Sequence, residues 1–309
     1  MSDPKFKSLS AVAALALAAT LVAGCATHPV VLGFAYDRVD DRLADRFASF
    51  ADFDASQSDW IDARVTHWHQ WHRRTQLPRY ADFLTSVGTR LSDGPTPSLA
   101  EVRAFAERAD ALYQALARCH PLTETDVLLA TLSDSQVDDI EARLAERLND
   151  KEREDVDERI DRTISGLSRL GFRFDERARA EVAAHYRRAP DIQALRERAL
   201  ETWAHRLIAL LDERQTADFG ERIRPQMARA LGLTRTAYPD AVAANLDSWV
   251  RMIHAILADY DSARRADIAD RLMALGAALA EVSRSGDGPD QAMQTTRLSC
   301  SAPTTGGTG

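Results

Sequence analysis

The sequence predicts an all-α protein, a multi-helix bundle or a layered helical array. Three observations support this fold class. Apolar residues recur at helical spacing along most of the chain, and no segment has the alternating period of a strand. Ala, Leu, Arg, Glu and Asp dominate the composition, whereas aromatic residues make up only 7% of it. Ser, Thr or Asp also stands repeatedly three residues before Gln or an acid, which is how a helix often starts.

The N-terminus has the pattern of a cleaved lipoprotein signal peptide. Lys5 and Lys7 precede an apolar run over residues 11–23, which is too short for a mature membrane span. The run ends in Leu21-Val-Ala-Gly-Cys25, which resembles the bacterial lipobox. The resemblance implies cleavage before Cys25, diacylation of its thiol and a third acyl chain on its new amino group. We therefore expect three parts: a signal peptide (1–24), one helical domain (25–285) and a disordered tail (286–309).

The same motif predicts a location. Several acyl chains on Cys25 would hold the protein on the membrane almost permanently. Ala26 follows Cys25, in place of the Asp that commonly marks retention in the inner membrane. We therefore expect an outer-membrane lipoprotein that faces the periplasm. No apolar run of spanning length follows Cys25.

Two cysteines remain after Cys25. The periplasm permits disulfides, so Cys119 and Cys300 could form one. The alternative is a buried thiol at Cys119 and an exposed thiol in the tail at Cys300.

The first helices are predicted from apolar spacing and caps. Residues 30–50 are expected to form one helix. Asp54 can cap the next helix, and Gln57 can close a capping box with it. Pro78 removes one helical hydrogen bond, so it either bends or ends that helix. The Asp-Gly-Pro run at residues 93–95 predicts a stop.

The rest of the chain reads as a series of capped helices. Starts are predicted at Ser98 with Glu101, at Thr123 with Asp126 (stapled by Leu122 and Val127), and at Ser133 with Gln136 (flanked by Leu132 and Val137). The later helices are expected over residues 133–170, ending at Gly171, and over residues 175–188, 191–211 and 240–282. A shorter helix with breaks at Gly220, Pro225 and Gly232 is expected over residues 219–233.

Residues 54–91 stand out because they hold three of the five tryptophans and three of the eight histidines. Trp68 and Trp71 are expected to bury this helix, and Arg73, Arg74 and Arg79 to tie the bend to acidic neighbours. The residues of the candidate binding or structural signature are Trp68, Trp71, His72, Arg73, Arg74, Leu77, Pro78 and Tyr80.

Three places carry a family resemblance. The first is the lipobox followed closely by residues 32–40 (Leu-Gly-Phe-Ala-Tyr-Asp-Arg-Val-Asp). The second is residues 53–57 (Phe-Asp-Ala-Ser-Gln), which open a helix that leads to residues 71–80 (Trp-His-Arg-Arg-Thr-Gln-Leu-Pro-Arg-Tyr), and the third is residues 132–136 (Leu-Ser-Asp-Ser-Gln). Together they resemble a family of proteobacterial lipoproteins known only as a domain of unknown function. The resemblance implies a helical fold and an envelope location, but no activity. The family usually has Glu before the Leu-Pro pair, where this chain has Gln76.

Catalytic and metal motifs are scarce in the sequence. His69 and His72 have the i, i+3 spacing of helical metal ligands, but no carboxylate follows Asp62 at ligand spacing. The alternative is that His72 packs beside Trp68 with one nitrogen satisfied, while His69 faces solvent. The chain has no nucleophile elbow, phosphate loop or zinc-protease motif. We therefore expect no catalytic residue, no metal and no cofactor, and a protein that is not an enzyme.

A binding role remains. The net charge of -8 argues against nucleic acid as a partner. We expect a lipid-anchored, non-catalytic binding or structural envelope protein whose protein partner is unidentified. One alternative is a chaperone or foldase, because Leu132-Ser-Asp-Ser-Gln136 is similar to the helix starts of Spy-like periplasmic chaperones. The other is a metal enzyme that depends on His69 and His72.

Overall fold

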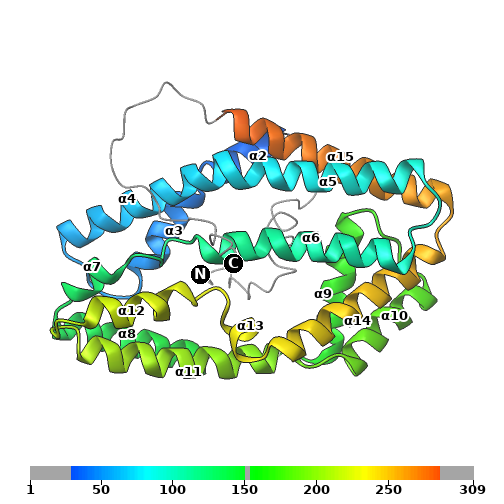
Figure 1. The fold of residues 1–309 in the computed structure, drawn as a ribbon. Helices are drawn as coiled ribbons and strands as arrows, with labels where there is room; N and C mark the ends of the chain where they lie inside the picture. The colour runs from blue at the N-terminus through cyan, green and yellow to red at the C-terminus, as the bar shows by residue number, and fades with distance from the viewer. Residues whose placement is uncertain (1–28, 150–153, 286–309) are drawn as a thin grey trace, which may run out of the picture.

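The computed structural model describes residues 29–149 and 154–285, and this part of the chain is helical with no strand (Figure 1). The all-α prediction is confirmed. The helices are α2 (Pro29–Tyr36), α3 (Val39–Ala48), α4 (Ala55–Trp71), the π-helical turn η1 (His72–Gln76), α5 (Leu77–Asp93), α6 (Leu99–Arg118), α7 (Asp126–Ala130), α8 (Asp134–Asn149), α9 (Val156–Arg169), α10 (Glu176–Arg188), α11 (Ile192–Asp212), α12 (Phe219–Ala228), α13 (Leu233–Ala237), α14 (Pro239–Ala258) and α15 (Ser262–Ser285).

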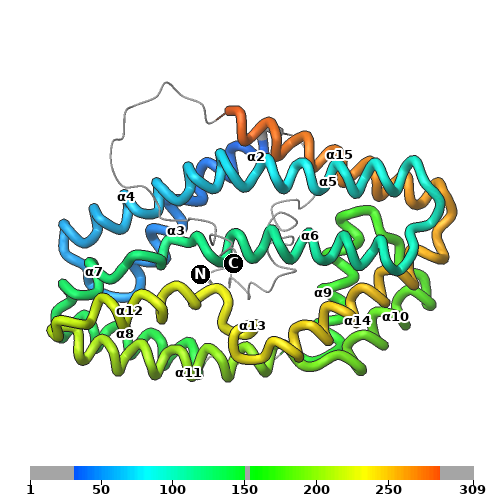
Figure 2. Tube along the Cα trace, in the orientation of Figure 1, coloured from blue at the N-terminus to red at the C-terminus, as the bar shows by residue number. Residues whose placement is uncertain are grey.

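The helices form an elongated, layered array. Helices α4, η1 and α5 follow one another as a continuous rod along one long side of the molecule, with α15 beside α5 (Figure 2). Helix α6 runs back below this rod (Figure 1). The opposite side holds α8, α11 and α12 at one end and α9, α10 and α14 at the other. None of the described helices is long and apolar enough to cross a membrane.

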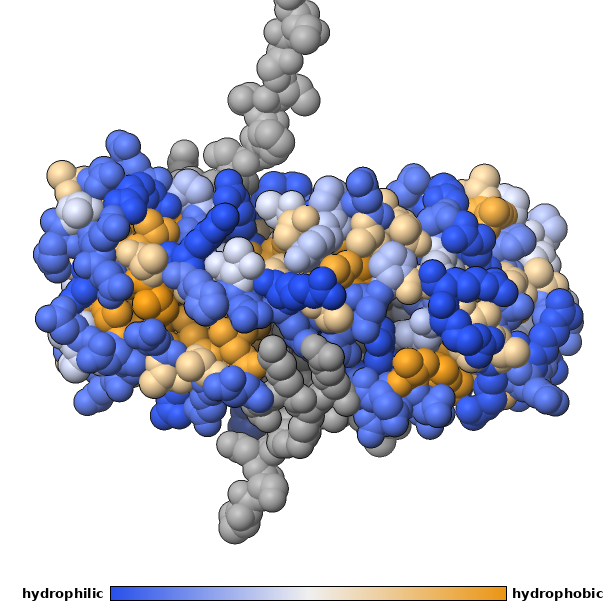
Figure 3. Space-filling view, turned by 90° about the horizontal axis from the view of Figure 1, so that it is seen from below, coloured by the Kyte–Doolittle hydropathy of each residue, from blue (hydrophilic) through white to orange (hydrophobic). Residues whose placement is uncertain are grey.

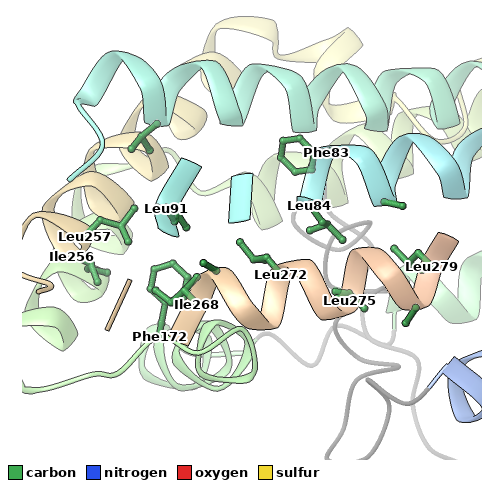
Figure 4. Packing of buried hydrophobic residues seen from close by; sticks show 14 of the residues in the cluster. Phe83, Leu84, Leu91, Phe172, Ile256, Leu257, Ile268, Leu272, Leu275 and Leu279 are labelled. Carbon is green, nitrogen blue, oxygen red and sulfur yellow. The ribbon is translucent and has the colours of Figure 1, made fainter. Parts of the chain in front are cut away.

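The closest helix pair is α5 with α15, which buries the centre of the main core (Figure 4). Leu84 and Leu91 of α5 meet Leu272 and Leu275 of α15 within this core. Glycine permits the close approach: a Cβ at Gly276 would lie 3.0 Å from the carbonyl oxygen of Ala81 on α5. The pairing is therefore set by backbone proximity as well as by apolar burial.

Two smaller cores fill the other end. One joins α8, α11 and α12 through fully buried Leu211 and Ile223, with Leu144 beside them. The other packs Ile61 and Val65 of α4 against Leu128 of α7. Because α4 contributes to one core and α5 to another, the rod spans both ends of the molecule.

Three predicted capping boxes are present, at Asp54 with Gln57, Ser98 with Glu101, and Ser133 with Gln136. The structure adds one at Asp155 with Glu158, which starts α9. The expected single helix over residues 133–170 is therefore wrong: α8 and α9 are separate. Gly171 adopts φ +96° at the end of α9, as a helix-ending glycine should.

Two other long helices are also divided. The predicted helix over residues 30–50 breaks at residues 37–38 into α2 and α3. The predicted helix over residues 240–282 breaks at residues 259–261, where the Asp261 carboxylate accepts the N–H of Arg264. In both cases the apolar spacing continues across a short turn, so periodicity alone does not reveal the break.

The predicted cap of Thr123 with Asp126 is wrong. Helix α7 begins after Thr125 without a side-chain cap, and Val127 is 62% exposed, so it does not act as a staple. The Thr123 hydroxyl instead donates to the carbonyl oxygen of His120 at 2.7 Å. Buried Arg64 of α4 donates to the carbonyl oxygen of Thr123 at 2.5 Å. This turn is thus held by a distant arginine.

Pro78 neither ends the helix nor leaves it regular. The five-residue π-helical turn η1 directly precedes α5, in which Pro78 occupies one of the first two positions, where a missing N–H is tolerated. The carbonyl oxygen of Arg73 accepts a hydrogen bond from the Ser283 hydroxyl of α15 at 3.1 Å. The proline is therefore accommodated by a local change of helix type, which often occurs at functional positions.

Cys119 ends α6, is buried and is disulfide-bonded. Its partner cysteine lies outside the described residues, as do the predicted signal peptide, Cys25 and the predicted tail with Cys300. The structure thus has no free thiol at Cys119, whereas the predicted pairing with Cys300 lies outside the described residues.

Candidate functional site

The signature residues of the rod meet α2 and α3 where α4 passes into η1. The site is a cluster of aromatic, histidine and arginine side chains, and we call it the aromatic–histidine cluster. Its members are Tyr36, Asp37, Asp40, Trp68, His69, His72, Arg73 and Tyr80. The break at residues 37–38 lets the chain turn back, so that Tyr36 ends α2 while Asp40 lies in the first turn of α3. Both side chains then face α4 and η1.

Tyr36 is the central aromatic residue. Its hydroxyl oxygen and Nδ1 of His72 are hydrogen-bonded at 2.7 Å. Its ring lies 4.6 Å from the His69 ring and 5.9 Å from the His72 ring, measured between centroids. Tyr36 is 5% exposed, and burial raises the pKa of its hydroxyl above the ordinary value. It therefore acts as a neutral hydrogen-bonding side chain.

His72 sits between aromatic rings. The Trp68 ring is 5.2 Å away and the Tyr80 ring 5.6 Å away. Burial, together with nearby His69, lowers the pKa of His72 to about 3. His72 is thus uncharged at neutral pH. The prediction that it packs beside Trp68 with one nitrogen satisfied is confirmed.

His69 does not face solvent, and that prediction is wrong. It is 5% exposed because α3 covers it, and its Nδ1 lies 3.3 Å from a carboxylate oxygen of Asp40. Burial lowers the pKa of His69, while the Asp40 carboxylate opposes the shift. Burial is the larger cause, so the contact is chiefly a hydrogen bond of neutral imidazole.

Arg73 and Trp68 tie the cluster to other segments. The Arg73 guanidinium forms an ion pair with Asp37 and lies 4.9 Å from the centre of the Tyr36 ring. The Trp68 indole N–H donates to the carbonyl oxygen of Cys119 at 2.9 Å, which attaches α4 to the end of α6. One segment of the rod therefore holds both the N-terminal helices and the disulfide-bonded end of α6.

Three buried atoms of this region have no hydrogen-bond partner among the described residues: Nε2 of His69, Oε1 of Gln76 and the Tyr80 hydroxyl. Burial raises the pKa of Tyr80 to about 12. Gln76 is 2% exposed. A carboxylate there would be buried, so the amide avoids the cost of burying a charge.

The structure brings together only part of the predicted signature. Trp68, His72, Arg73 and Tyr80 belong to the cluster, whereas Leu77 is part of the main core. Trp71 and Pro78 are half-buried, and Arg74 and Arg79 are exposed. The predicted tie to an acidic neighbour is thus seen for Arg73.

Sequence reasoning missed the partners from α2 and α3, namely Tyr36, Asp37 and Asp40. They belong to the first segment of the family resemblance, which was a usable signal. It also missed a buried amide pair: Nε2 of Gln136 donates to Oε1 of Gln57 at 2.6 Å, and Nε2 of Gln57 donates to Oε1 of Gln136 at 3.2 Å. These two glutamines cap α4 and α8, so one pair of side chains starts both helices and joins them.

The two candidate metal ligands contact different residues: His69 contacts Asp40, and His72 is hydrogen-bonded to Tyr36. In the part of the chain that the structure describes, no three His, Cys, Asp or Glu residues are grouped to hold a metal ion. The chemistry that the cluster supports is hydrogen bonding and aromatic contact between neutral groups, with one arginine ion pair.

The fold and the cluster define a class: an all-α protein whose long helical rod is pinned to its N-terminal helices by aromatic and histidine side chains. The chain belongs to the family of unknown function DUF6279, whose model matches residues 49–238. This match covers α4 to α13, including the signature residues 68–80 and the Gln57–Gln136 pair. No curated protein and no solved structure showed a significant match to the chain.

Proposed function

We propose that the protein is a lipid-anchored, non-catalytic binding or structural protein of the bacterial envelope. The observation that carries this proposal is the use of the signature side chains. Tyr36, Asp37 and Asp40 on the N-terminal helices bind His72, Arg73 and His69 on the rod. The polar groups that resemble a site therefore attach the segment after the predicted anchor to the rest of the molecule.

The cysteines support an exported protein. Cys119 is disulfide-bonded, and disulfides persist in oxidising compartments such as the periplasm. The lipobox supports acylation of Cys25 and a location on the outer membrane, facing the periplasm. Both features support an exported protein.

The chaperone alternative loses its sequence argument. The Leu132–Gln136 segment is similar to a Spy-like helix start, but Gln136 here caps α8 and pairs with buried Gln57. Helix capping and this amide pair account for the motif. The face seen in Figure 3 is mostly hydrophilic, with hydrophobic groups gathered chiefly in the left half of the view.

The anchor is tested by changing Cys25 to Ser in the full-length protein expressed in cells. We expect the wild type in the outer-membrane fraction with an acylated N-terminal residue, and the variant in a soluble or unprocessed pool. A variant that remains membrane-bound and acylated would overturn the proposal. The control is Cys300→Ser, which leaves Cys25 and the lipobox unchanged and should remain in the outer-membrane fraction.

The binding role is tested by crosslinking in intact cells. A photoreactive residue replaces Arg74 or Arg79, which are exposed next to the aromatic–histidine cluster, or Arg177 on α10 as the matched control. We expect one crosslinked protein from the first two positions. We expect no crosslinked protein from position 177 or from the Cys25→Ser protein. No product from any position, or the same products from all three, would contradict a partner at this face.

A further inference from the structure

Large apolar side chains that remain exposed are scattered singly, except on α2. In the described part of the chain, Leu99, Val127, Val156 and Leu231 each stand alone on a different segment, whereas Val31 and Phe34 lie together on α2. Residues at i and i+3 are neighbours on one side of a helix. Val31 is 45% exposed and Phe34 is 60% exposed, so this side of α2 is an apolar surface in contact with solvent.

The opposite side of α2 is buried. Leu32 is 1% exposed and Tyr36 is 5% exposed, and α2 packs along α15. A Cβ at Gly33 would lie 3.8 Å from the Val282 side chain, so the two helices fit closely. Because α2 carries no charged residue between Pro29 and Tyr36, its outer face has nothing polar to keep it in water. Single exposed apolar residues are ordinary, but a wholly uncharged helix with apolar groups on both sides indicates a second contact surface.

The short distance along the chain between Cys25 and α2 indicates what covers the outer face of α2. Pro29 is four residues after Cys25. A fully extended chain spans at most about 3.6 Å per residue, so α2 begins within about 14 Å of the Cys25 α-carbon. The headgroup layer of a bilayer is several ångströms thick. A lipid on Cys25 therefore keeps α2 at the membrane surface, where apolar helix faces bury themselves between headgroups and acyl chains.

We propose that the Val31–Phe34 face of α2 lies in the interface of the membrane that holds Cys25, and that this contact orients the whole protein. The inference rests on the lipid anchor of the proposed function. Arg38 fits the same surface, because its exposed guanidinium lies 4.1 Å from the centre of the Phe34 ring and carries the charge that lipid phosphates attract. Asp37 beside it is neutralised by its ion pair with Arg73.

The aromatic–histidine cluster connects α2, and with it the membrane contact, to the rod. Tyr36 at the end of α2 is bonded to His72, and Asp37 to Arg73, in the middle of the rod. Tilting α2 on the membrane therefore tilts the rod with it. The lipid supplies attachment, α2 supplies a second contact, and together they set the direction in which the body points into the periplasm.

The test uses the acylated full-length protein in vesicles of phosphatidylethanolamine and phosphatidylglycerol. A nitrobenzoxadiazole fluorophore is placed on Phe34→Cys or, as the matched control, on Val127→Cys, which is 62% exposed and lies on α7 at one end of the molecule. Protein without an introduced cysteine gives the background labelling. Val31→Cys provides a second probe of the same face.

At positions 34 and 31 we expect emission shifted to the blue and strong quenching by lipids brominated in their acyl chains, with neither effect at position 127. Equal behaviour at positions 34 and 127 in an acylated, vesicle-bound protein would overturn the docking of α2 and leave the anchor standing. A blue shift without quenching would mean that the chain or a second copy covers the face, and would also overturn it. Protein that carries no acyl chain and does not float with the vesicles would overturn both proposals.

Discussion

The hydroxyl of Tyr36 lies 2.7 Å from Nδ1 of His72, although the two residues are 36 positions apart. This bond joins α2 to the π-helical turn of the rod. Since burial lowers the pKa of His72 to about 3, the imidazole stays neutral and shares this hydrogen bond with the Tyr36 hydroxyl without a charge. Ionisation of His72 therefore does not disturb this hydrogen bond at neutral pH.

Removing this hydroxyl should destabilise the protein. Tyr36→Phe leaves the buried nitrogen of His72 without a partner, which costs about 1–3 kcal/mol. Tyr80→Phe is the matched control, because the Tyr80 hydroxyl has no partner among the described residues. Urea unfolding of the two variants should show a clear loss of unfolding free energy for Tyr36→Phe and little change for Tyr80→Phe. Equal effects would show that the Tyr36–His72 bond adds no net stability.

The glycine contacts between α5 and α15 lead to a second prediction. A Cβ at Gly276 would lie 2.8 Å from Oγ1 of Thr85 and 3.0 Å from the carbonyl oxygen of Ala81. Gly276→Ala should therefore force the helices apart and lower the unfolding free energy by about 1–3 kcal/mol. Gly166→Ala on α9 meets nothing within 4 Å and should raise it by about 0.5–1 kcal/mol. Thermal unfolding compares the two; a stabilising Gly276→Ala would contradict the close approach.

Buried histidines should make the protein acid-sensitive. Burial lowers the pKa of His120 and of His185 to about 4, against 6.5 for an ordinary histidine. The unfolded chain binds more protons than the folded one between these values, so stability is full above pH 6.5 and falls as the pH drops toward 4. Each group contributes a slope of at most about 1.4 kcal/mol per pH unit. Unfolding free energy measured from pH 7.5 to pH 4 should follow this decline.

A single substitution tests the assignment to these histidines. His185 Nδ1 is hydrogen-bonded to the Ser248 hydroxyl at 2.9 Å, and glutamine can keep that bond without titrating. His185→Gln should reduce the slope of unfolding free energy against pH below pH 6.5, and His120 should account for part of the slope that remains. His205→Gln, at an exposed position of α11, controls for the loss of a histidine as such. An unchanged slope in His185→Gln would show that its protonation is not linked to unfolding.

The disulfide of Cys119 leads to a chemical prediction. Cys119 in the unreduced protein should resist thiol alkylation even after unfolding, and should react once a reductant is added. Peptide mapping without reduction identifies its partner. If Cys25 carries lipid, the linked peptide contains Cys300, since the chain has three cysteines. Alkylation of Cys119 before reduction would contradict the bond.

The reciprocal Gln57–Gln136 pair can be tested by a double-mutant cycle. Gln136→Met leaves the buried Gln57 amide poorly satisfied and removes the α8 cap, so a loss of about 1–3 kcal/mol is expected. Adding Gln57→Met should cost less than it does in the wild type, because the stranded amide is gone. Urea unfolding of the four proteins gives the coupling; strictly additive losses would show that the two amides do not depend on each other.

The predictions from sequence were best where a local rule was enough. The capping boxes at Asp54, Ser98 and Ser133 are seen because each involves residues only three apart. Long helices were over-extended, as at residues 240–282, because apolar periodicity can continue in phase across a turn of three residues. The helix start at Asp155 was overlooked within a charged run, although its capping box has the same form.

The candidate site was half predicted. Trp68, His72, Arg73 and Tyr80 stand on one continuous segment, so their clustering follows from the sequence. Their partners on α2 and α3 could not be deduced, because these residues reach the rod only after the chain turns back at residues 37–38, and that turn was not predicted.

The sequence by itself determined that this protein is helical, where several helices begin, and that it belongs to a family of unknown function. Only the tertiary structure decided what the histidines do. His69 was expected in solvent, but α3 covers it and supplies Asp40. Helix propensity and capping act between near neighbours in the chain, whereas burial, and with it the charge of a histidine, depends on which distant helix lies above it.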